Sequence, residues 1–145
     1  MKFFFNKVLA TIKNTHATEK THLENVTEDI INTIEDKAFA ISQQNVMYAN
    51  TKELGGYYYL IVIVVGTFKI KTKKGGTLSI SGKDFELELK TDMDEFESEY
   101  SNIPNRNITR IDFQIEEEDI SKIDKLLIDS LLLKAKKHQL LFKTF

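Results

Sequence analysis

The chain has 145 residues, a formal net charge of −2 and no cysteine, and this length suits one domain with its own hydrophobic core. The lack of cysteine excludes disulfides, thiolate metal sites, iron–sulfur clusters and cysteine nucleophiles. The slight negative charge argues against general nucleic-acid binding, which requires an excess of basic residues. We therefore expect a single domain over residues 1–145.

The first 14 residues predict an amphipathic helix, because their apolar side chains recur at helical spacing beside lysines. A secretory signal needs a longer apolar stretch than this one, which Asn6 interrupts. We expect the helix to pack on the domain, if loosely; contact with an anionic membrane surface is the alternative. The side chains predicted to touch such a membrane are Phe3, Phe4, Phe5 and Lys7. Without an export signal, we expect a cytoplasmic protein.

A second helix is predicted over residues 18–42, where apolar residues return every three or four positions. They are Leu23, Val26, Ile30, Ile34, Ala38 and Ile41. Residues 51–56, which end in two glycines, break the chain before the most hydrophobic stretch, residues 57–66. That stretch is too short for a membrane helix, which takes about 20 residues. Its β-branched residues and tyrosines predict a buried strand.

Strict alternation of apolar and polar residues predicts an antiparallel meander over residues 68–90. A turn at residues 74–76 separates the first two strands, and a turn at residues 81–84 separates the last two. Lysines, hydroxyl side chains and glutamates then follow one another on the polar face. We expect this face to be exposed to solvent.

The C-terminal third predicts one more strand and one more helix. Alternation marks a strand at residues 109–116, after an acidic segment, residues 92–100, that is expected to be a short helix or an irregular link. A leucine-rich stripe indicates a helix from about residue 119 to residue 137. Residues 140–145 are expected to form either a last strand or an extension of this helix. The predicted fold is α+β, with an antiparallel meander sheet of four to five strands packed against N-terminal and C-terminal amphipathic helices.

No motif identifies a catalytic site, a metal site or a cofactor. The segment from Gly76 to Asp84 lacks the spacing and the final hydroxyl of a phosphate-binding loop. The acidic run has no glycine turn of the kind that a calcium loop needs. His16, His22 and His138 do not stand at a spacing that places two ligands on one helix face.

The net charge alternates in sign along the chain, being positive over residues 1–20, 69–90 and 131–145 and negative over residues 21–68 and 91–130. Such patches bear on partners, so we expect a non-enzymatic binding protein whose partner is another protein or a second copy, not nucleic acid. The predicted partner-binding residues are Asp92, Asp94, Glu95, Glu97, Glu99, Lys69, Lys71 and Lys73.

Two other functions remain open at this point. One is a small-ligand protein or hydrolase-like enzyme whose site is assembled from separate segments, with His16, His22, Asp92 and Asp94 as candidates. The other is a peripheral membrane protein attached through its first 14 residues. The sequence identifies neither a partner nor an oligomeric state.

Overall fold

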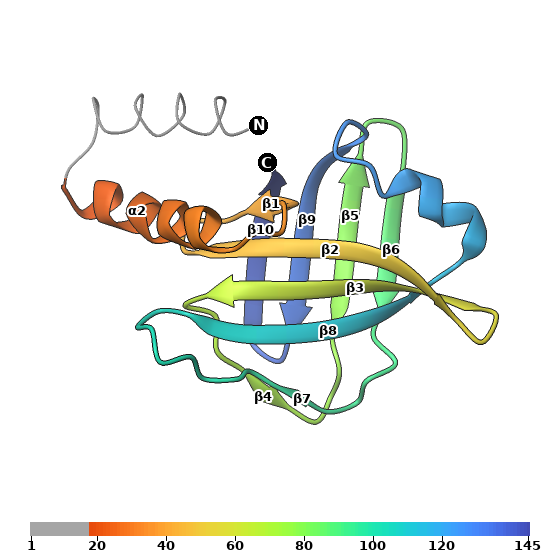
Figure 1. The fold of residues 1–145 in the computed structure, drawn as a ribbon. Helices are drawn as coiled ribbons and strands as arrows, with labels where there is room; N and C mark the ends of the chain where they lie inside the picture. The colour runs from red at the N-terminus through yellow and green to blue at the C-terminus, as the bar shows by residue number, and fades with distance from the viewer. Residues whose placement is uncertain (1–17) are drawn as a thin grey trace.

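The computed structural model describes residues 18–145 and is built mainly of strands (Figure 1). Its two helical elements are α2 (Thr18–Thr33) and the 3-10 helix η1 (Glu117–Lys122). The strands are β1 (Ala40–Ile41), β2 (Asn45–Leu54), β3 (Tyr57–Gly66), β4 (Lys71–Thr72), β5 (Thr77–Gly82), β6 (Glu86–Lys90), β7 (Phe96–Glu97), β8 (Asn107–Ile115), β9 (Ile128–Ala135) and β10 (His138–Thr144).

Eight strands form one antiparallel sheet in the order β6-β5-β9-β10-β1-β2-β3-β8. The sheet curls until β2, β3 and β8 lie across β5, β6, β9 and β10, which gives a nearly closed barrel (Figure 1). Strands β4 and β7 form a separate two-stranded sheet below one end of this barrel. Among residues 18–145, no helix combines the length and the apolar composition that a membrane crossing requires.

The interior of the barrel is filled by one side-chain face of each strand. Leu60, Val62 and Val64 alternate along β3 and are fully buried, while the residues between them are only partly covered. Phe113 of β8 and Phe142 of β10 fill the middle and have no exposed surface. This period of two is what a sheet with one covered face requires. The barrel therefore has a packed core.

Helix α2 packs on the outside of the barrel against β2 and β3. Ile30 is fully buried, and it belongs to one apolar cluster with Val46, Tyr48 and Val65 of these strands. The helix ends at Thr33, whose hydroxyl donates to the carbonyl of Asp29 at 2.8 Å. The chain then continues into β1. The apolar cluster around Ile30 is separate from the core inside the barrel, and it joins the helix to the barrel.

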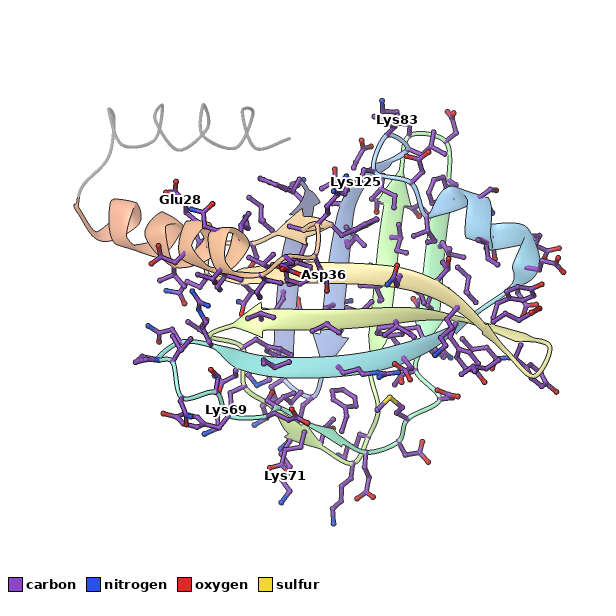
Figure 2. All side chains as sticks on the ribbon, in the orientation of Figure 1. Glu28, Asp36, Lys69, Lys71, Lys83 and Lys125 are labelled. Carbon is purple, nitrogen blue, oxygen red and sulfur yellow. The ribbon has the colours of Figure 1, made fainter. Side chains whose placement is uncertain are left out.

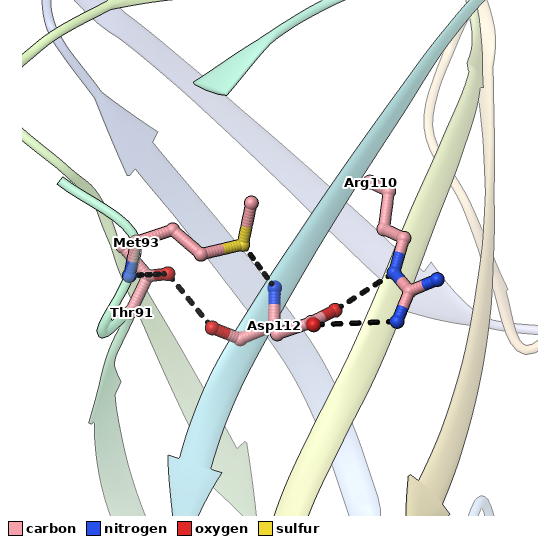
Figure 3. A network of polar contacts seen from close by, with 4 residues as sticks. All are labelled: Thr91, Met93, Arg110 and Asp112. Atoms are coloured by element: carbon pink, nitrogen blue, oxygen red, sulfur yellow. Dashed lines mark hydrogen bonds and ion pairs between the residues drawn. The ribbon is translucent and has the colours of Figure 1, made fainter. Parts of the chain in front are cut away.

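The two edge strands of the sheet meet along a short seam (Figure 3). Thr91, just after β6, forms a bridge with Phe113 of β8, and its hydroxyl donates to the carbonyl of Asp112 at 2.7 Å. The amide of Asp112 donates to the sulfur of Met93 at 3.2 Å. Exposed strand edges are free to pair with other chains, and this seam occupies part of the β8 edge.

The predicted α+β fold is wrong in its class and in its second half. Residues 18–145 form ten strands in place of four to five, and no C-terminal helix in this part of the chain packs on the sheet. Where a helix was predicted over residues 119–137, η1 is followed by strand β9. A continuous leucine run fits either a helix or a strand, and β9 became a strand because β5 and β10 pair with it on its two sides.

The predicted meander is only half present. Strands β5 and β6 do form the expected hairpin, and β8 confirms the strand predicted at residues 109–116. However, β4 pairs with β7 and not with β5, so the turn at residues 74–76 connects two different sheets. The predicted helix 18–42 ends at Thr33, strand β2 was missed, and residues 138–144 are a strand. The predicted N-terminal helix lies outside the described residues.

Candidate functional site

The separate small sheet places the predicted lysine stripe next to the predicted acidic run. Lys71 of β4 is paired with Glu97 of β7, and the ammonium of Lys73 lies 4.0 Å from a carboxylate oxygen of Glu95. The amide of Gly75 donates to the carbonyl of Asp94 at 2.8 Å. The sequence suggested two independent patches, whereas the structure makes them neighbours in one unit.

A hollow of about 540 Å³ lies beside β4, on the side of the turn between β9 and β10. We call it the lysine hollow; its lining consists of Lys71, Thr72, Lys73, Lys74, Lys136 and Lys137. Figure 2 shows Lys71 projecting from the lower end of the molecule, where the small sheet lies. A neighbouring hollow shares Lys74 and Lys136 and adds Lys90, Lys134 and Asp94. Positive charge thus extends from the small sheet onto the barrel.

The electrostatics of the lysine hollow are weakly compensated. Among the residues that the structure describes, Lys73 is the only lining lysine with an ion pair, and both partners of that pair are largely exposed. Exposed pairs of this kind contribute about 0–1 kcal/mol. Glu95 and Glu97 face a different, smaller hollow with Lys71 and Lys73. The lysine hollow therefore keeps an excess of positive charge.

Lys136 is held in an unusual backbone conformation at the mouth of this hollow. Its φ is 57°, in the left-handed region that residues with a Cβ rarely adopt. Its ammonium donates to the carbonyl of Lys71 at 3.0 Å, which ties the β9–β10 turn to the small sheet. Lys136 is the first residue of the two-residue turn between β9 and β10, and such turns require a positive φ at this position. This conformation directs two consecutive lysines, Lys136 and Lys137, to the lysine hollow.

The lysine hollow differs from a compact phosphate site. Such sites present several free backbone amides in a loop or at a helix start. Here the amide of Lys74 donates to the hydroxyl of Thr72 at 3.1 Å, and that of Gly75 is used by Asp94. No arginine lines the hollow. Lysines act as flexible point charges and suit an extended anionic partner better than a small, precisely held one.

The remaining predicted site residues lie around this region without converging on one point. Lys69 is exposed in the segment before β4, while Asp92 and Glu99 are exposed on either side of β7. Phe3, Phe4, Phe5, Lys7 and His16 lie outside the described residues, and so does the side chain of His22. A convergence of His16 and His22 with Asp92 and Asp94 therefore lies outside the described side chains, and within residues 26–145 no three acidic or histidine side chains cluster as metal ligands do.

Sequence reasoning missed the lysines on the far side of the lysine hollow. Lys136 and Lys137 had been placed at the end of a helix, whereas they form the two-residue turn between β9 and β10. A Lys-Lys pair is not a typical hairpin turn, which prefers Asn-Gly or Asp-Gly. The sequence thus contains no local signal that would have identified this turn.

No family model, curated protein or solved structure matches the chain. Any function has to be argued from the residues themselves.

Proposed function

We propose that the protein is a small non-enzymatic binding protein that recognises an acidic segment of a partner protein at the lysine hollow. The observation that carries this proposal is that five lysines line one hollow, and that among the described residues only one of these lysines forms an ion pair. Like charges held together destabilise a fold, and an acidic partner relieves that repulsion.

The form of the lysine hollow favours an extended partner. It is open to solvent and its cations are long side chains, so it lacks the preorganised donors that tight small-molecule binding requires. An acidic segment contacts several lysines at once and gains affinity from each of them. The binding should weaken as salt concentration rises, because exposed charges are screened.

The test compares two variants with the same change in charge. A fluorescent peptide rich in aspartate and glutamate is titrated with the protein, and its anisotropy reports binding. The double substitution Lys74→Gln with Lys137→Gln removes two charges from the lysine hollow, and Lys52→Gln with Lys83→Gln removes two exposed charges elsewhere. We expect the first variant to bind about tenfold more weakly, since two surface charge contacts contribute about 1 kcal/mol or somewhat more in total. The control should change affinity less than about twofold.

Other anions are measured in the same assay. A single-stranded RNA of equal charge and vesicles containing anionic lipid are offered as competitors. Weak competition supports the proposal. It is refuted if either competitor binds much more tightly than the peptide, or if both double variants lose affinity equally.

A further inference from the structure

Strand β4 of the small sheet has one edge that pairs with β7 and one edge that is open. On the β7 side, the carbonyl of Ile70 accepts from the amide of Ser98 at 2.8 Å, and the amide of Ile70 donates to the hydroxyl of Ser98 at 2.9 Å. Thr72, two positions further, is paired with Phe96. Successive residues of a strand direct their backbone groups to opposite sides, so the residues beside and between these two face away from β7. They are Lys69, Lys71 and Lys73.

The backbone groups of these three lysines are available to a further strand. Within residues 18–145, none of the three amides donates a hydrogen bond. The carbonyl of Lys71 accepts from the ammonium of Lys136 at 3.0 Å, so this edge faces the turn between β9 and β10, which Figure 1 shows just above β4. The side chain of Lys136 is exposed, and exposed side chains change rotamer within nanoseconds, so an amide of a partner is able to take its place at this carbonyl. The lysine hollow lies along this edge.

The side chains along the open edge alternate between exposed cations and a buried group. Lys71 and Lys73 are exposed, whereas Thr72 between them is 3% exposed. On the β7 side, Glu97 is the partner of Lys71, and Glu95 lies 4.0 Å from Lys73. Residues directly opposite each other on neighbouring strands have Cβ atoms about 5 Å apart, so carboxylates on an added strand reach the same two ammonium groups from the other side. The charge of this edge therefore fits acidic residues at every second position.

We infer that the acidic segment binds as an extended strand that adds to the open edge of β4, with acidic residues at every second position. This inference rests on the proposed function and specifies the conformation and the spacing of the partner. In strand addition, backbone hydrogen bonds supply affinity and alternate side chains supply specificity. An acidic helix would bond its own backbone groups to one another and would leave the edge of β4 unused.

The first test compares two fluorescent peptides of equal charge in the anisotropy assay. One alternates threonine and glutamate, and the other carries the same number of glutamates on an alanine-rich helix that a side-chain crosslink holds in shape. We expect the extended peptide to bind at least about tenfold more tightly, since it alone forms backbone hydrogen bonds with β4. Equal or tighter binding of the helix overturns the inference and leaves the proposed function in place. If neither peptide binds, the proposed function fails, and the inference fails with it.

Backbone methylation of the extended peptide tests the hydrogen bonds directly. In an added strand, the amides of one alternating set face β4 and those of the other set face away. One peptide is therefore methylated at its glutamate amides and a second at its threonine amides. We expect one of the two to bind about tenfold more weakly and the other to change less than about twofold. Equal effects overturn the inference, because contacts through side chains alone do not alternate in this way.

Two substitutions at Lys71 test the same hydrogen bonds from the side of the protein. Lys71→Gln and Lys71→Pro both remove the ammonium, but only the second removes the amide, and an edge strand tolerates proline where the nitrogen faces away from the neighbouring strand. We expect Lys71→Gln to bind the extended peptide about threefold more weakly than the wild type. Lys71→Pro should bind about tenfold more weakly than Lys71→Gln.

The amide resonances of Phe96 and Ser98 report whether the small sheet persists in the Lys71→Pro variant. If they are unchanged and the two variants bind with equal affinity, the inference is wrong. If they shift, the comparison of the two methylated peptides on the wild-type protein decides.

Discussion

Gly66→Ala is expected to destabilise the protein more than any other glycine-to-alanine change at a strand end. Gly66 closes β3 opposite Asn45, with a φ of 152°. A Cβ added there would lie 2.1 Å from the carbonyl oxygen of Gln44 and 2.4 Å from the side-chain oxygen of Asn45. That side-chain oxygen accepts from the buried amide of Phe68 at 2.8 Å. The substitution therefore forces backbone apart and strains a buried hydrogen bond.

The size of the effect follows from two costs, the overpacking around the added Cβ and the weakening of the buried hydrogen bond. Overpacking a tight site costs about 1–3 kcal/mol, and loss of a buried hydrogen bond costs about 1–3 kcal/mol. Together they reduce the free energy of unfolding by about 4 kcal/mol, a large fraction of the total for a domain of this size. Gly55→Ala is the matched control, because Gly55 has a φ of 60° but no atom within 4 Å of an added Cβ. It should cost about 1 kcal/mol, from backbone conformation alone.

Thermal and urea unfolding of the wild type, Gly66→Ala and Gly55→Ala measure the difference in stability. We expect the melting temperature of the Gly66→Ala variant to fall by about 10–15 °C and that of the Gly55→Ala variant by about 3–4 °C. If both variants melt within a few degrees of each other, the close approach of the two backbones at Gly66 is not a constraint, and the reasoning is wrong.

Two further predictions concern the seam of the barrel and the buried tyrosine. Thr91→Val removes a hydroxyl that donates to the carbonyl of Asp112 and accepts from the amide of Met93, so the free energy of unfolding in urea should fall by about 1–2 kcal/mol. The control Thr51→Val, on the exposed part of β2, should leave it unchanged, and equal stability of both variants would exclude a role for the seam. The raised pKa of Tyr48, about 12 against 10.0, means that the unfolded chain loses this proton before the folded protein does. The free energy of unfolding does not depend on this proton below pH 10 and decreases as the pH rises from 10 towards 12. Urea denaturation should therefore show that the wild type loses stability relative to Tyr48→Phe within this window. Parallel pH profiles of the two proteins would show that the hydroxyl is not buried as described.

Local signals in the sequence were interpreted correctly where a strand and its turn are close together. The alternation around Ile111 and Phe113 predicted β8, and the turn at residues 81–84 predicted the hairpin of β5 and β6. These features depend on the pleat of a strand and on the conformations of turn residues, which nearby sequence largely sets. The α+β class was wrong because the apolar run in β9 is compatible with two periods.

The pairing of strands was beyond these local signals. Leu133 of β9 lies opposite Leu78 of β5 and Leu140 of β10. The pairing of Leu133 with Leu140 belongs to a short hairpin, but the pairing of Leu133 with Leu78 joins segments that are far apart in the chain. Lys136 reaches Lys71 by the same means, across 65 positions. The spacing of residues in the sequence contains no information about such distant partners.

By itself, the sequence determined that thiolate chemistry is absent and that charge is divided into opposed blocks. Only the tertiary structure decided that two of these blocks, the lysine stripe and the acidic run, lie side by side in the small sheet, and that a third completes the lysine hollow. It also decided that the hydroxyl of Tyr48 is buried near Asp36 and has no hydrogen-bond partner within the described part of the chain. The physical reason is that composition and periodicity are properties of local segments, whereas a binding site is formed where curling of the sheet brings distant segments together.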